Sequence, residues 1–198
     1  MNMELLRGTK VRLTALSRDD AATISGWFGD VGYLRLQDTN MALPKNQAQM
    51  LADLEELEKS SNAIAFAIRT VADGALIGTI GFYEIEWANQ GAWLGMGLGE
   101  REAWGQGYGT EALHLALQYA FDELNLHRIT LTVIAYNERA IALYERVGFQ
   151  REGVFREFGQ RDGRWYDMYL YGMLRPEWKS GVNQYSEIVQ PRVTGGHG

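Results

Sequence analysis

The chain changes its local pattern at a glycine-rich segment, Trp104-Gly105-Gln106-Gly107-Tyr108-Gly109-Thr110-Glu111-Ala112. Three glycines at alternate positions allow a tight backbone turn, so that several N–H groups can point at one ligand. An apolar-periodic helix follows and places its positive end at the same point. The segment therefore predicts a phosphate-binding loop, with a glycine turn that only caps the helix as the alternative.

The spacing of the glycines separates this loop from two commoner phosphate loops. No Lys-Ser/Thr pair follows Gly109, and Gly-x-Gly-x-Gly is not the Gly-x-Gly-x-x-Gly of dinucleotide-binding folds. The loop instead resembles the pyrophosphate loop of the GNAT superfamily of N-acetyltransferases, (Gln/Arg)-x-x-Gly-x-(Gly/Ala). In that family the loop joins the fourth strand to a helix and holds the diphosphate of acetyl-CoA. Trp104 stands where the motif has Gln or Arg, which removes one side chain but none of the backbone donors.

A second motif lies downstream, at Asn137-Glu138-Arg139-Ala140-Ile141-Ala142-Leu143-Tyr144-Glu145-Arg146-Val147-Gly148-Phe149. It resembles the family's Asn-x-x-Ala-x-x-Leu-Tyr-x-x-x-Gly-Phe, in which the Asn binds the pantetheine arm and the Tyr points at the thioester sulfur. Asn137 is also a good helix N-cap, and Tyr144 lies on an apolar stripe typical of a core aromatic. For Tyr144 we favour the functional role, because a phenol can protonate the leaving thiolate.

Composition is that of one enzyme-sized domain. The 198 residues are 46% hydrophobic, and we expect a single domain over residues 1–178 with a flexible C-terminal tail over residues 179–198. The formal net charge of −6 disfavours binding to DNA or RNA. Because cysteine is absent, disulfides and a covalent Cys–acetyl intermediate are excluded.

Further absences narrow the class of protein. His114, His127 and His197 are scattered and have no metal-ligand spacing, so we expect no metal. The N-terminus lacks the apolar core of a signal peptide, and no apolar run reaches membrane-spanning length. We therefore expect a cytoplasmic protein without a membrane partner. A homodimer is left open.

Alternating apolar residues predict seven strands, and apolar residues at helical spacing predict helices after Ser17, Pro44, the glycine loop and Asn137. Residues 29–41 are expected to be irregular. Together with the family resemblance, these elements predict a mixed α/β, GNAT-like domain with a mostly antiparallel, splayed central sheet flanked by helices. The predicted strands cover residues 10–16, 63–69, 76–86, 92–98, 126–135, 154–158 and 165–174.

The strand before the loop carries Gly95 and Gly97, which usually mark a bulge or a place where a ligand approaches the backbone. A packing site that tolerates glycine is the alternative. The resemblance implies that this strand pairs with pantetheine and that the Leu98 N–H polarises the thioester carbonyl. The expected cofactor-binding residues are Met96, Gly97, Leu98, Trp104, Gly105, Gln106, Gly107, Tyr108, Gly109, Thr110, Asn137 and Ala140.

Without cysteine, we expect the amine to attack acetyl-CoA directly in a ternary complex. The acceptor arrives as an ammonium ion and must lose a proton, which requires a carboxylate acting through water. Alternation along the neighbouring strand puts Glu84 and Glu86 on one face with Phe82. Glu84 is our candidate base, and a plain solvent-facing carboxylate is the alternative.

The C-terminal hairpin, with Gly163, Trp165 and Asp167, resembles that of RimJ/RimL-type ribosomal-protein acetyltransferases and the related spermidine acetyltransferases. The similarity extends over about residues 6–176. It implies a primary amine acceptor, first a peptide or protein N-terminus and second a polyamine. A non-catalytic acyl-CoA-binding module and an unrelated nucleotide-phosphate binder remain as alternatives.

Acceptor contacts are predicted from aromatic and acidic side chains. Residues 29–41, which hold Tyr33, Arg35 and Gln37, are expected to help select the amine and to leave room for an extended chain beside the hairpin. Core packing is the alternative for the aromatics. The candidate wall residues are Tyr33, Trp87 and Trp165, and the carboxylates that could hold a polyamine are Asp53, Glu55 and Glu56.

Overall fold

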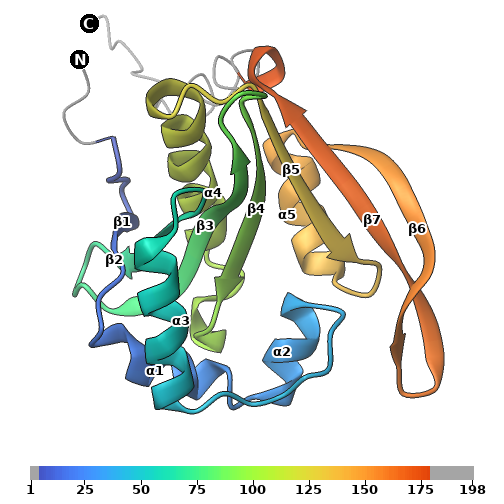
Figure 1. Cartoon of the computed structure of the whole chain (residues 1–198), viewed down its shortest axis with the longest axis horizontal. Helices are drawn as coiled ribbons and strands as arrows, with labels where there is room; N and C mark the ends of the chain where they lie inside the picture. Colours follow the sequence, from blue (N-terminus) through green and yellow to red (C-terminus); the bar gives the residue numbers. More distant parts are fainter. Residues whose placement is uncertain (1–4, 179–198) are drawn as a thin grey trace, which may run out of the picture.

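A computed structural model describes residues 5–178 of the chain (Figure 1). The predicted C-terminal tail, residues 179–198, lies outside this range. The predicted mostly antiparallel sheet is confirmed: within the described residues, seven strands run in the order β1-β2-β3-β4-β5-β7-β6, and of their pairs only β4–β5 is parallel. The strands are β1 (Val11–Ala15), β2 (Ile64–Thr70), β3 (Leu76–Glu86), β4 (Gly91–Leu98), β5 (Arg128–Ile134), β6 (Gln150–Arg161) and β7 (Arg164–Leu174).

The centre of the sheet is splayed. β4 pairs with β5 only over residues 91–93, opposite residues 128–130. Beyond Trp93 the two strands diverge, and Figure 1 shows the gap that opens between them toward α2. The β5-facing backbone N–H and C=O groups of the rest of β4 therefore have no strand partner. The Leu98 carbonyl accepts a hydrogen bond from the Trp104 indole, and the other groups are available to a ligand.

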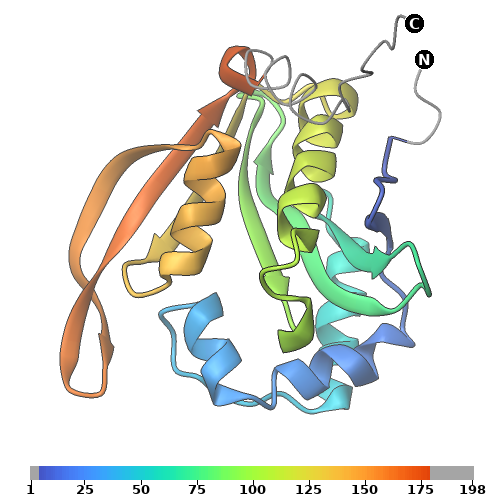
Figure 2. The ribbon, with the colours of Figure 1, turned by 180° about the vertical axis from the view of Figure 1, so that it is seen from behind.

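Within residues 5–178, five labelled α-helices surround the sheet: α1 (Asp20–Trp27), α2 (Val31–Gln37), α3 (Gln47–Lys59), α4 (Tyr108–Gln118) and α5 (Glu138–Val147). Residues 175–178 are also helical. A π-helical turn, Tyr119–Glu123, continues α4. Figure 2 shows α4 and α5 together on one face of the sheet, whereas α3 lies on the opposite face in Figure 1. α2 lies across the open end of the gap between β4 and β5 in both views.

Helix α2 corrects the expectation that residues 29–41 are irregular. The Asp30 side chain caps it by accepting hydrogen bonds from the N–H groups of Gly32 (2.8 Å) and Tyr33 (3.4 Å). A helix of seven residues is too short to show a helical period in the sequence, which explains why it was not predicted. The second predicted helix also begins later than Pro44, because a capping box of Asn46 and Gln49 starts it at Gln47.

Two hydrophobic clusters hold these layers together. The larger one packs α4 against the sheet and includes the fully buried Ile80, Phe82 and Leu113. The smaller one joins α1, α2 and α3, with Trp27 and Met50 among its members. The larger cluster includes residues of β3 and β4, and the smaller one includes Tyr33 of α2. The two clusters therefore pack the elements that border the gap between β4 and β5.

Candidate active site

A cavity of about 340 Å³ occupies the open end of the gap. Its walls come from α2, from the end of β4, from the glycine loop and from α5, so segments far apart in the sequence meet there. The lining residues are Tyr33, Leu36, Gln37, Met96, Gly97, Leu98, Ala103, Trp104, Gly105, Gly107, Gly109, Thr110, Asn137, Arg139, Ala140, Ala142, Leu143, Tyr144 and Arg146.

Most of the predicted cofactor-binding residues are brought together by this cavity. Gln106 and Tyr108 are the two that do not line it. The Gln106 side chain instead donates a hydrogen bond to the backbone oxygen of Glu102. Arg139 and Arg146, which sequence analysis does not select, do line the cavity, and their spacing of seven along a helix is the signal that places them on one face.

The glycine loop has the backbone that the sequence pattern predicts. Gly105 (φ +74°) and Gly107 (φ +85°) both adopt left-handed conformations, and Gly107 is the N-cap of α4. A residue with a Cβ atom would be strained in this backbone conformation, which explains why glycine stands at both positions. The Lys10 ammonium donates a 2.8 Å hydrogen bond to the Gln106 carbonyl and adds a positive charge beside the loop.

Glu111 anchors the first turn of α4 to the start of β1. Its carboxylate accepts hydrogen bonds from the backbone N–H groups of Thr9 (2.9 Å), Lys10 (2.7 Å) and Val11 (2.7 Å), and from the Thr9 hydroxyl (2.7 Å). Burial by itself would raise its pKa, but these hydrogen bonds lower the pKa of Glu111 below its usual value. These hydrogen bonds join the first turn of α4, which directly follows the loop, to the edge strand β1.

Tyr144 lies on the cavity wall formed by α5. Its ring is 8% exposed and packs edge-on against Phe149, with 5.9 Å between the ring centroids. Burial raises the pKa of Tyr144 to about 12, so the phenol keeps its proton at neutral pH. Within residues 5–178 its hydroxyl has no hydrogen-bond partner. The hydroxyl is therefore free to donate to a ligand in the cavity.

Asn137 uses both ends of its side-chain amide within the protein. Its Oδ1 accepts a 3.2 Å hydrogen bond from the Ala140 N–H, which confirms the predicted N-cap. Its Nδ2 donates a 3.3 Å hydrogen bond to the Leu36 carbonyl and so ties α5 to α2. A contact of Asn137 with pantetheine stays a prediction.

Gly97 allows α2 to approach the backbone of β4. A Cβ atom at Gly97 would lie 2.4 Å from the Tyr33 hydroxyl oxygen and 2.7 Å from the Gln37 side-chain amide. Any larger residue would therefore displace both side chains. Desolvation raises the pKa of Tyr33 well above its ordinary value, so this hydroxyl also stays protonated.

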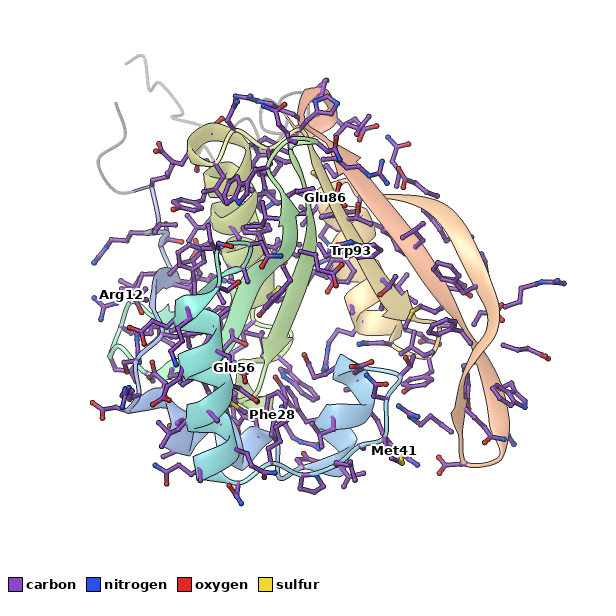
Figure 3. All side chains as sticks on the ribbon, viewed as in Figure 1. Arg12, Phe28, Met41, Glu56, Glu86 and Trp93 are labelled. Carbon is purple, nitrogen blue, oxygen red and sulfur yellow. The ribbon has the colours of Figure 1, made fainter. Side chains whose placement is uncertain are left out.

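The remaining predicted residues lie away from the cavity. A register shift between Tyr83 and Glu86 interrupts β3, and Glu84 has a φ of +48° within it. Glu84 and Glu86 are exposed while Phe82 is buried, so the predicted common face is wrong. Figure 3 shows Glu86 at the end of the sheet distant from α2. As a candidate base, Glu84 stays a prediction.

Of the three predicted wall residues, Tyr33 alone lines the cavity. The Trp87 indole donates a 3.0 Å hydrogen bond to the Ser61 carbonyl, and Trp165 is 57% exposed on β7. A role for either tryptophan in acceptor binding stays a prediction.

The tip of the β6–β7 hairpin contacts the segment around α2 directly. Arg35 forms a bidentate ion pair with Asp162 (2.7 and 3.1 Å). Arg161 donates 2.9 Å hydrogen bonds to the carbonyls of Asp38 and Asn40. These contacts join the tip of the hairpin to residues 35–40, and room for an extended chain along the rest of the hairpin stays a prediction.

Residues 5–178 contain neither a metal-binding cluster nor a membrane-spanning helix. No group of three or more histidine, aspartate or glutamate side chains in this range is arranged to hold a metal ion. No helix within the same residues is long and apolar enough to cross a membrane.

The splayed sheet, the glycine loop and the cavity beside Tyr144 together define an acetyl-CoA-dependent acyltransferase domain. The chain belongs to the GNAT acetyltransferase family, since that family's profile, the acetyltransferase (GNAT) domain, matches residues 10–150. It is an N-acetyltransferase, as are its curated relatives by name.

Two curated relatives show the range of similarity. The uncharacterized N-acetyltransferase p20 of Bacillus licheniformis is 31% identical over 180 residues, which are 89% of this chain and 99% of the relative. The ribosomal protein uS5-alanine N-acetyltransferase of Escherichia coli (strain K12) is 27% identical over 148 residues, which are 74% of this chain and 75% of the relative.

Solved structures share the fold. Spermidine N-acetyltransferase from Vibrio cholerae, in complex with CoA and spermine, has a TM-score of 0.80 at 24% identity and covers 87% of this chain and 99% of that chain. A chimera of the Vibrio cholerae enzyme has a TM-score of 0.75 at 26% identity, with 85% of this chain and 98% of that chain covered.

Proposed function

We propose that this protein transfers the acetyl group of acetyl-CoA to the α-amine of a peptide or protein N-terminus. The observation that carries the acceptor class is the charge of the site. Within residues 5–178 no Asp or Glu lines the cavity, whereas two arginines do. A polycationic acceptor would meet no counter-charge there, but a peptide with a single terminal amine needs none beyond the group that takes its proton.

Two of the three carboxylates considered for polyamine binding, Asp53 and Glu55, already form ion pairs within the protein. Asp53 pairs with Lys45 at 2.5 Å, and Glu55 pairs with Arg18 at 2.9 Å. Both belong to α3, no residue of which lines the cavity. The resemblance to a ribosomal-protein alanine N-acetyltransferase supports the same choice of acceptor.

In the proposed mechanism the amine attacks the thioester carbon directly, and the C–S bond breaks as the tetrahedral intermediate collapses. The departing sulfur takes the proton of the Tyr144 phenol, which burial keeps protonated. The Leu98 N–H, at the end of β4, polarises the carbonyl oxygen. Glu84, which lies outside the cavity, is proposed to accept the ammonium proton through water. The second proton, which the nitrogen loses as the amide forms, returns to Tyr144 and restores the phenol.

A polyamine acceptor is the second candidate. It is favoured by the similarity of this fold to spermidine N-acetyltransferase structures at 26% identity. Exposed carboxylates would have to hold the distal ammonium groups, and salt screens such contacts strongly. The KM for a polyamine would therefore rise steeply with ionic strength, while that for a peptide held by pocket contacts would change little.

An acceptor panel tests the proposal. We expect an alanine-initiated peptide to give a kcat/KM at least about tenfold above that of spermidine, since about 1.4 kcal/mol of differential transition-state binding suffices. Thiol release from acetyl-CoA measures the rate, and the same peptide with a blocked N-terminus is the control. Faster turnover of spermidine would reverse the assignment. Thiol release at the hydrolysis background with every amine would favour a non-catalytic acyl-CoA-binding module.

The pH dependence of kcat/KM distinguishes the two amines independently. A peptide α-amine has a pKa of about 8 and a polyamine amine one near about 10, and only the neutral amine attacks. We expect kcat/KM for the peptide to rise up to about pH 8 and then stay level. Tyr144 is active when protonated, and its pKa of about 12 means that it adds no falling limb below that range. A fall between about pH 8 and 10 would contradict this role of Tyr144.

A further inference from the structure

The cavity wall formed by α5 carries positive charge. Arg139 and Arg146 lie seven residues apart on α5, with Ala142 between them, and all three line the cavity. Within residues 5–178 neither arginine forms an ion pair with a carboxylate. A guanidinium group on a cavity wall without a counter-ion favours binding of an anion.

Arg139 is held in place by the residue that departs from the loop motif. Its guanidinium carbon lies 3.5 Å from the centroid of the Trp104 ring. The indole N–H of Trp104 donates a 2.9 Å hydrogen bond to the Leu98 carbonyl, which fixes the ring against the end of β4. Stacking on a fixed aromatic face orients the planar guanidinium before any ligand binds.

A second arginine, Arg101, lies near Arg139 at the same indole. Arg101 lies over the same indole at 5.5 Å, but its charge is offset by an ion pair with Asp30. Burial, together with the charge of Arg101, lowers the pKa of Arg139, which shows that its positive charge is poorly compensated in the free protein. A bound phosphate would remove that cost.

We propose that Arg139, stacked on Trp104, is the side chain that binds the diphosphate of acetyl-CoA from the α5 side of the cavity. It supplies the charged side chain that the loop lacks, because Trp104 stands where the motif has Gln or Arg. The loop N–H groups and Arg139 then bind the phosphates from two walls, and the guanidinium donates charge-assisted hydrogen bonds. This inference rests on acetyl-CoA as the acetyl donor.

Binding of three ligands tests the proposal. Arg139→Met keeps an unbranched side chain against the indole but removes the charge. By isothermal titration calorimetry we expect the Kd of CoA and of dephospho-CoA to rise about tenfold or more, since both contain the diphosphate. Pantetheine has no phosphate, so its Kd should not change. Arg139→Lys should restore part of the affinity, because it returns the charge without the planar fork.

Arg151→Met provides the matched control. Arg151 also stacks on an aromatic ring, that of Tyr169 at 4.6 Å, but it does not line the cavity. Its replacement should leave the Kd of all three ligands unchanged. Melting temperatures without ligand check folding, and Arg139→Gln replaces Arg139→Met if the latter is unstable.

Two results would overturn the assignment. One is an unchanged Kd for CoA in the Arg139 variants. The other is a loss seen with CoA but not with dephospho-CoA, which would move Arg139 to the 3′-phosphate. If the wild-type protein bound CoA no better than pantetheine, the phosphate-binding loop itself would be refuted, and the failure would be distinguishable from that of Arg139 alone.

Discussion

Replacing Tyr144 with phenylalanine is expected to lower kcat by about a hundredfold or more, the range that a positioned general acid contributes. The phenol acts on the leaving sulfur, so its loss raises the barrier without weakening ground-state binding. The Kd of acetyl-CoA should therefore stay close to the wild-type value. Steady-state kinetics with the preferred acceptor and calorimetry with acetyl-CoA measure the two quantities separately.

Tyr171→Phe is the matched control for this variant. Tyr171 is fully buried and donates a 2.7 Å hydrogen bond from its hydroxyl to Glu145, but it does not line the cavity. Losing that hydroxyl should lower the free energy of unfolding by about 1 kcal/mol and leave kcat unchanged. If Tyr144→Phe behaved in the same way, with wild-type turnover, Tyr144 would be a core aromatic and nothing more.

Replacing Gly107 with valine is expected to weaken CoA binding by about a hundredfold, the equivalent of losing one or two charge-assisted hydrogen bonds from the loop. Gly107 has a φ of +85°, and a Cβ atom there would lie 3.2 Å from the Lys10 ammonium. A β-branched residue avoids this backbone conformation, so the loop must change shape and its N–H groups turn away from the phosphate. Thermal shift with CoA, compared with adenosine, measures the loss.

Gly163→Val separates the loss of the ligand site from general strain. Gly163 has a similar φ of +74° in the turn between β6 and β7, with nothing within 4 Å of its Cβ position. Both variants should lower the melting temperature of the free protein, because both force a branched residue into a left-handed conformation. CoA should still stabilise the Gly163 variant. Equal CoA stabilisation of the Gly107 variant would count against the diphosphate assignment.

The two phosphate-binding elements differ in how they can be recognised. Gly105 and Gly107 are close in sequence, and glycine is the residue type that adopts a positive φ most readily, so the residue type itself indicates the conformation. Arg139 is different, because the sequence of a helix that begins at Glu138 does not determine which ring its second residue contacts. The stack on Trp104 exists only because β5 and α5 return the chain to the end of β4.

The predicted strands and most helices were recoverable from the sequence because side-chain periodicity is local. Helix α2 was missed because its seven residues rest on the Asp30 cap and on contacts from distant segments, including those of Arg35 and Asn137. The common face of Glu84 and Phe82 was wrong because a bulge in β3 depends on its register with β4.

Residue type and spacing thus established the glycine loop, the N-cap at Asn137 and the family resemblance, since each needs only a few neighbouring residues. The tertiary structure decided the membership of the cavity: it placed Tyr33 and Gln37 against Gly97, left Trp87 and Trp165 outside, and set Arg139 on Trp104. These contacts join residues distant in sequence, and their distances follow from how β4 and β5 diverge and how α2 spans the gap. Local backbone preferences do not predict that divergence, because it results from the packing of all the elements together.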